Sequence, residues 1–293
     1  MNTMKWVLFD RTEGATTRDG KKLSADAMRQ MAQAVQAQIN EEFAVEWGAK
    51  AELRVGAGAH DVQPGEWAYI FVPTLPDAPG ASAYHDITDK GVPYAFCAVK
   101  TCGSLLGREG VSVDLSHEIL ETFGDEGANL YAYDNNAGVL HAMEMCDAVE
   151  MQTYAKPAKD GTPVQVSNWL LRSWFMLGAK GPFEYMTLAK VPGAVQPAGP
   201  LKTAAGHGGN YQIVGKWSGS THDVFARRAV EAAEQHIDGV RHKGMVPHWS
   251  SRTALRLSQM AKKDPVATGL PADMRNFGKN RTSRVPVNSE RLG

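Results

Sequence analysis

Residues 24–43, with the sequence SADAMRQMAQAVQAQINEEF, carry the most regular apolar pattern in the chain. Ser24 is one of the residue types that cap helix N-termini. Large apolar side chains then recur at steps of three and four residues, at Met28, Met31, Val35, Ile39 and Phe43. This spacing places them on one face of a helix. The stretch therefore predicts a helix from Ser24 to about Phe43 that packs its apolar stripe against another layer.

Short apolar runs lie on both sides of this helix. β-Branched and aromatic content predicts strands at Lys5–Phe9, Ala51–Val55, Trp67–Val72 and Tyr94–Val99. The three prolines within residues 73–80 exclude regular structure there. A second helix is expected at Asp114–Phe123, with Gly124 as its C-terminal stop. This order of elements predicts an α/β (α+β) fold, in which a long helix and a shorter one pack against a mixed sheet.

The second half of the chain differs from the first in its amino-acid composition. After Gly127 the sequence becomes rich in Gly, Pro and Asn, and it predicts an irregular C-terminal region. A further helix is expected at about 223–237, from the spacing of Val224, Ala229, Ala233 and Ile237. We expect a main domain over residues 1–220, a helical segment over 221–250 and a basic, flexible tail over 251–293.

Composition limits the class of protein. The chain has 293 residues, 43% hydrophobic and 22% charged, with a formal net charge of −1. We find neither a transmembrane run nor a signal peptide, and nucleic acid is not expected to bind the core. The tail carries nine basic and three acidic residues, a net charge of +6. With an odd number of cysteines, three, a disulfide framework is not expected. These features predict a protein of a reducing compartment, the cytoplasm.

The stretch SHEILETFGD at residues 116–125 carries the chemistry. On a helix, His117 and Glu121 share a face one turn apart, so both can reach a single metal ion. Glu118 lies about 100° around the helix, where it can flank the metal and accept a proton from bound water. This is the logic of H-E-x-x-H metallopeptidases, with Glu121 in place of the second histidine.

The replacement by Glu121 affects the choice of metal. An added carboxylate weakens a zinc ion as a Lewis acid and makes Ca²⁺ or Mn²⁺ possible alternatives to Zn²⁺. A third ligand is needed, and Asp125, Glu144 and Asp147 are the candidates. We favour Glu144, because a carboxylate from a later element commonly completes such sites, but the spacing leaves all three open.

These motifs resemble those of a zincin-like family of largely uncharacterised bacterial and phage proteins. The similarity rests on the helix motif from His117 to Asp125, on Asn129 and Tyr133, and on the segment Glu144-x-Cys146-Asp147-x-x-Glu150. Glu126 stands where the family usually has proline. The resemblance covers about residues 50–215. It implies a zincin-like fold in which the long first helix backs the sheet and the second helix binds the metal.

Other candidate residues have structural interpretations that we prefer. His85 is expected in a loop, hydrogen-bonded to Asp86, rather than bound to substrate. Tyr131, Tyr133 and Tyr154 could stabilise an oxyanion, but packing is the favoured role. The Cys146 thiol is expected to be buried with a raised pKa. The aromatic residues Trp169, Trp174 and Phe175 are expected in the core.

Two functions follow from this reading, and they belong to different classes. The first is a metal-dependent hydrolase, a zincin-like peptidase acting on a peptide or protein substrate, with Glu118 as general base. The second is a structural or interaction protein, such as a phage virion component, which uses an inactive scaffold and assembles as a homo-oligomer or in a virion through the basic tail. A calcium-stabilised fold is a third option.

Overall fold

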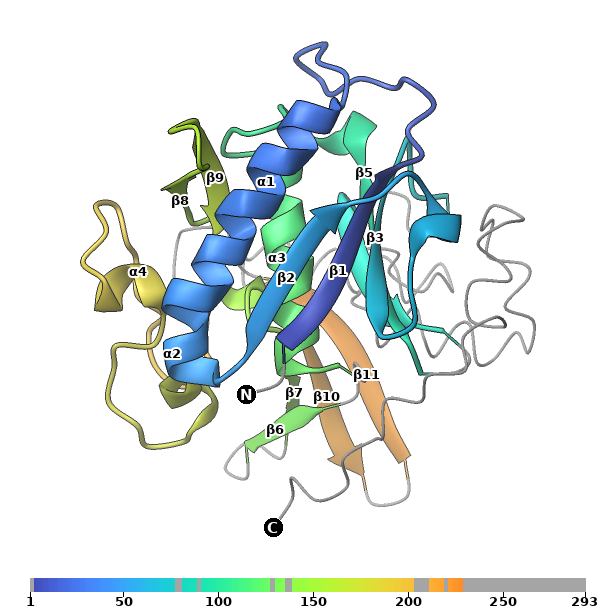
Figure 1. Cartoon of the computed structure of the whole chain (residues 1–293). Coiled ribbons are helices and arrows are strands. Elements are labelled where there is room, and N and C mark those ends of the chain that lie inside the picture. Colours follow the sequence, from blue (N-terminus) through green and yellow to red (C-terminus); the bar gives the residue numbers. More distant parts are fainter. Residues whose placement is uncertain are drawn as a thin grey trace.

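The central feature of the chain is a mixed sheet with helices packed against it, as the sequence predicts (Figure 1). The computed structural model describes residues 3–76, 81–88, 91–126, 130–134, 139–202, 211–218 and 221–228. Within these residues, no helix is long and apolar enough to cross a membrane.

The sheet has five strands in the order β2-β1-β3-β5-β4. Their bounds are β1 Thr3–Asp10, β2 Lys50–Val55, β3 Glu66–Val72, β4 Ala83–Ile87 and β5 Pro93–Ala98. The pairs among β2, β1, β3 and β5 are parallel, and β4 is antiparallel to β5. Successive residues of β1 pack into two cores on opposite faces, Trp6 and Leu8 in one and Val7 and Phe9 in the other. Burial of both faces explains the continuous apolar runs in these strands.

The predicted first helix is confirmed. It begins after Ser24, whose hydroxyl accepts a hydrogen bond from the backbone N–H of Ala27 at 3.1 Å. Helix α1 (Ala25–Gln38) continues through a π-helical turn (Ile39–Phe43) into α2 (Ala44–Trp47). The helix ends at Gly48, whose φ of +73° lies in the left-handed region that favours glycine. The apolar stripe faces the sheet and joins the core that contains Trp6.

The second helix, α3 (Val111–Gly124), lies beside α1 against the sheet (Figure 1) and begins three residues before the predicted start. A buried polar contact fixes its position. Ser116 donates a hydrogen bond to Gln38 Oε1 at 2.8 Å and accepts one from the backbone N–H of Ser167 at 3.0 Å. Gln38 in turn donates to Tyr154 and to the carbonyl of Ser167. These bonds join α3 to α1 and to the hairpin formed by β8 (Thr153–Pro157) and β9 (Pro163–Ser167).

The remaining elements form two smaller sheets. The first has the order β11-β10-β7-β6, and the second is the hairpin β8–β9. Their bounds are β6 Tyr131–Asp134, β7 Val139–Ala142, β8 Thr153–Pro157, β9 Pro163–Ser167, β10 Tyr211–Ser218 and β11 Thr221–Arg228. A short helix, α4, spans Tyr185–Leu188.

Two expectations for the chain need correction. The helix expected at 223–237 is wrong over its first part, because Thr221–Arg228 is strand β11 and pairs with β10; the rest of that stretch lies outside the described residues. The segment Tyr84-His85-Asp86, expected in a loop, lies in β4, which pairs with β5. The basic tail over 251–293 lies outside the described residues, and the domain boundaries stay a prediction.

Candidate metal centre

Helix α3 is buried on nearly every side, including its charged positions. Leu115 and Ile119 are fully buried in the core, while Glu118 and Glu121 are only 6% and 3% exposed. Carboxylates are almost never buried to this degree unless they are paired or bind a metal. The arrangement of the groups around these two acids therefore decides what the helix can do.

His117 contacts two carboxylates, Glu121 and Asp147. His117 Nε2 lies 3.2 Å from Glu121 Oε1 and 3.2 Å from Asp147 Oδ1. The first pair is set by the helix, in which residues four apart share a face. Asp147 comes from the start of a short 3-10 turn, Asp147–Val149. The sequence-based pairing of His117 with Glu121 is therefore present, and Asp147 is the candidate acid that contacts His117.

His85 is a member of the cluster that the sequence analysis missed. From β4, its Nδ1 lies 2.7 Å from Glu118 Oε2 and 3.7 Å from Glu121 Oε2. His85 is 1% exposed. Glu121 thus turns one carboxylate oxygen towards His117 and the other towards His85. Residues 83–87, Ala-Tyr-His-Asp-Ile, do not alternate apolar and polar side chains, so the sequence offered little signal for this strand.

The segment after β7 supplies further groups. Glu144 lies with His85 and Glu121 in a group whose ligand atoms are all within 4.8 Å of one another, and Cys146 joins His117 and Glu121 in a similar group. The backbone N–H of Cys146 also donates to Glu121 Oε1 at 3.2 Å. Glu144 therefore lies on the His85 side of Glu121, whereas Asp147 contacts His117.

Asp125 stands apart from these groups. It follows the last residue of α3, and its Oδ2 accepts a hydrogen bond from the backbone N–H of Leu130 at 2.8 Å. In the described part of the chain, neither Asp125 nor Asp147 belongs to a group of three ligand atoms within 4.8 Å of one another, but Asp147 contacts His117. Its observed contact is that of a residue that shapes the loop after the helix.

The neighbouring charges change the protonation of the cluster. Burial alone would lower the pKa of His117, but the Glu121 carboxylate and the hydrogen bond with Asp147 raise it well above its usual range. Burial, together with the charge of Glu121, raises the pKa of Asp147 well above the ordinary value. The raised pKa values of both groups favour their protonated forms, and a cation that binds there must displace those protons.

The donor set fits a zinc ion. Zinc–nitrogen bonds are about 2.0–2.1 Å and zinc–oxygen bonds about 2.0–2.2 Å, so a nitrogen and an oxygen at the tetrahedral angle are about 3.3–3.5 Å apart. The two His117 separations of 3.2 Å are close to this value. Histidine nitrogen and carboxylate oxygen are both ligand atoms that zinc binds in proteins. His117 and Glu121 would hold the ion, with Asp147 as the second carboxylate on His117.

Other candidates from the sequence occupy structural positions. Burial raises the pKa of the Cys146 thiol well above its usual value, as predicted. Tyr154 is buried, and its hydroxyl donates to Glu42 Oε2 at 2.5 Å, away from the cluster. Trp169 and Trp174 are each 1% exposed and belong to the apolar cores. Asn129 and the side chains of Tyr131 and Tyr133 lie outside the part of the chain that the structure describes.

Comparisons of the chain with protein-family models, with curated proteins and with solved structures find no match. The fold and the site define an α/β protein with a buried cluster of histidine and carboxylate side chains on and around one helix. The resemblance to the zincin-like family stays a prediction.

Proposed function

We propose that the chain is a metal-dependent hydrolase of the zincin type, a peptidase, with Zn²⁺ held by His117, Glu121 and Asp147. The observation that carries this proposal is the position of His117 Nε2, 3.2 Å from both a Glu121 oxygen and an Asp147 oxygen. Bound zinc would supply a Lewis acid that lowers the pKa of water. Zinc is preferred to Ca²⁺ because calcium takes six to eight oxygen ligands.

Glu118 is the proton acceptor in this proposal. Its Oε2 lies 2.7 Å from His85 Nδ1, so a proton taken up by the carboxylate can be shared with the imidazole. The adjacent position of Glu118 on α3 keeps it beside the metal ligands without making it one of them. His85 is then a positioning residue that orients the Glu118 carboxylate.

Replacement of Glu118 by Gln tests the proposal. Glu118→Gln keeps the side-chain shape, so zinc content should be unchanged while hydrolysis of a peptide library falls about 10²–10⁴-fold. Glu52→Gln is the matched control, because Glu52 lies on β2 with its side chain 63% exposed, and it should change neither property. Hydrolysis that survives in Glu118→Gln, or a purified chain that binds no zinc, would contradict the proposal.

The burial of the cluster favours a second candidate, a structural or interaction protein. With Glu118, Glu121 and Glu144 all less than a tenth exposed, the cluster can hold the fold together without admitting a substrate. The tail with its net charge of +6 would then contact a second copy or an acidic virion partner. Deletion of residues 268–293 should abolish assembly in light scattering while the core stays folded. Unchanged assembly would count against this function.

The two candidates imply different settings. A peptidase of this kind would act in the cytoplasm, and an assembly protein would be part of a virion. Localisation of the full chain in host cells and in purified particles separates them.

A further inference from the structure

Three metal-ligating side chains meet at a second place, outside the His117 cluster. Cys97 lies on β5, Cys102 follows a short 3-10 turn (Val99–Thr101), and Asp114 lies in the first turn of α3. Their sulfur and oxygen atoms lie within 4.8 Å of one another. Both thiols are buried, at 0% and 2% exposure. None of these residues belongs to the site proposed above.

The distances among these atoms match a tetrahedral site. With Zn–S of about 2.3 Å and Zn–O of about 2.0–2.2 Å, two sulfurs should be about 3.8 Å apart, and sulfur and oxygen about 3.5–3.7 Å apart. The sulfurs of Cys97 and Cys102 are 3.8 Å apart. Asp114 Oδ2 lies 3.7 Å from Cys97 Sγ and 3.2 Å from Cys102 Sγ. Three ligand atoms are therefore already close to three corners of a zinc tetrahedron.

Tyr69 on β3 adds an independent observation at the same place. Its side chain is fully buried, and its hydroxyl makes no hydrogen bond with the described residues. Burial, followed by the charges of Cys97 and Asp114, raises the pKa of this hydroxyl well above its ordinary value. A buried hydroxyl without a hydrogen bond costs free energy, and a bound cation would give it a partner.

We propose that Cys97, Cys102 and Asp114 bind a structural Zn²⁺ ion, with the Tyr69 hydroxyl facing the fourth position. The ion ties the end of β5 to the first turn of α3, one turn before His117 and Glu118. Closed sites made of thiolates are typical of zinc that stabilises a fold. A disulfide between the two cysteines is less well supported, because it gives no role to the carboxylate that lies within 3.7 Å of both sulfurs.

Cobalt substitution in the full chain tests this site directly. Chelated protein, reduced with a phosphine, is titrated with Co²⁺, and thiolate-to-cobalt charge-transfer absorption in the near ultraviolet is recorded. The wild-type chain should develop this band. Cys102→Ser should lose the band, and Asp114→Asn should weaken the affinity at least about tenfold, as the loss of even an outer-shell partner does. The variant His117→Ala empties the other site and should keep the band.

The outcomes separate the two sites. A band that persists in His117→Ala and disappears in Cys102→Ser supports the thiolate site, whether or not the chain hydrolyses peptides. If the wild-type chain gives no charge-transfer band, or if the band survives in Cys102→Ser and disappears in His117→Ala, the proposal is wrong. The same holds if the untreated chain contains Cys97 and Cys102 as a disulfide in mass spectrometry. The wild-type result needs no variant to fold.

Discussion

Replacement of Gly124 by Ala should push residues 144–150, called here the acidic segment, away from α3. A Cβ atom on Gly124 would lie 2.6 Å from Met145 Cγ and 3.0 Å from Sδ, and it would also overlap Cε. Ordinary contact between such atoms needs about 3.5–4.0 Å. Met145 is fully buried, and its Cγ atom is close to the backbone, so movement of the side-chain tip alone does not relieve the overlap. Because Met145 lies between Glu144 and Cys146, its displacement moves the groups that approach Glu121.

The expected cost follows from overpacking. Inserting a methyl group into a packed core typically costs about 1–3 kcal/mol of unfolding free energy. For a domain of this size, this lowers Tm by roughly 2–12 °C. Zinc affinity should also fall, by at least about tenfold, because a shifted Asp147 no longer meets His117.

Thermal unfolding of the chelated chain and zinc titration are the assays. Gly199→Ala is the matched control, because a Cβ there meets only Lys202 Cδ at 3.7 Å. Adding Met145→Ala to Gly124→Ala should recover part of the loss in zinc affinity by removing the clash. If Gly124→Ala matches Gly199→Ala in Tm and in zinc affinity, the close approach of the acidic segment to α3 is refuted.

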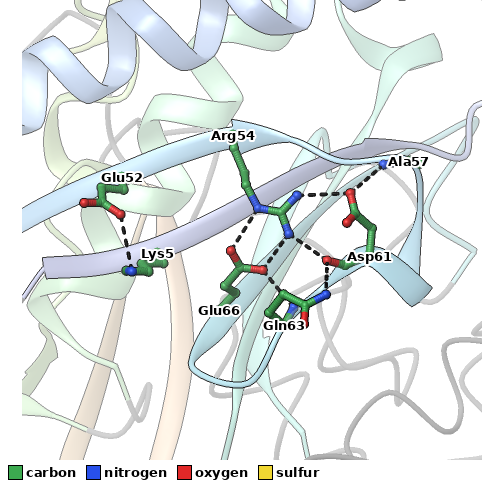
Figure 2. Close-up of polar contacts among 7 residues, drawn as sticks. All are labelled: Lys5, Glu52, Arg54, Ala57, Asp61, Gln63 and Glu66. Atoms are coloured by element: carbon green, nitrogen blue, oxygen red, sulfur yellow. Dashed lines mark hydrogen bonds and ion pairs between the residues drawn. The ribbon is translucent and has the colours of Figure 1, made fainter.

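Two further predictions concern stability. Ser116→Ala leaves the buried N–H of Ser167 without its 3.0 Å partner, and the free energy of unfolding in urea should fall by about 1–3 kcal/mol. Ser112→Ala is the comparison, because it removes only one hydrogen bond to a carbonyl. Equal stability of the two variants would argue against this reasoning. The backbone N–H of Ala57, followed by Arg54, lowers the pKa of Asp61 (Figure 2). The stabilisation from Asp61 is therefore present above its ordinary pKa of about 3.9 and lost as pH falls through the lower folded value. The Tm difference between wild type and Asp61→Asn should shrink on acidification, and a difference that grows would contradict this sign.

Local patterns predicted the parts of the fold that depend on neighbouring residues. The stripe from Met28 to Phe43 defined the first helix because its period is set by the helix itself. The pairing of His117 with Glu121 was predictable for the same reason, since four residues make one turn.

The features that the sequence left open or missed depend on contacts between distant segments. The contact of His85 with Glu118 joins residues 33 apart, and that of His117 with Asp147 joins residues 30 apart. β4 is an edge strand that pairs with β5 and contains polar residues, so its sequence lacks the apolar run that predicted the other strands. The spacing of Val224 and the following alanines fitted a helix, but pairing with β10 makes Thr221–Arg228 a strand.

Anomalous diffraction tests the metal centre most directly. Data collected at the zinc absorption edge from crystals of the zinc-loaded full chain should show a peak about 2.0–2.2 Å from His117 Nε2 and from Glu121 Oε1. An anomalous map with no peak beside His117, including a map whose zinc lies only at the cysteines, would contradict the account.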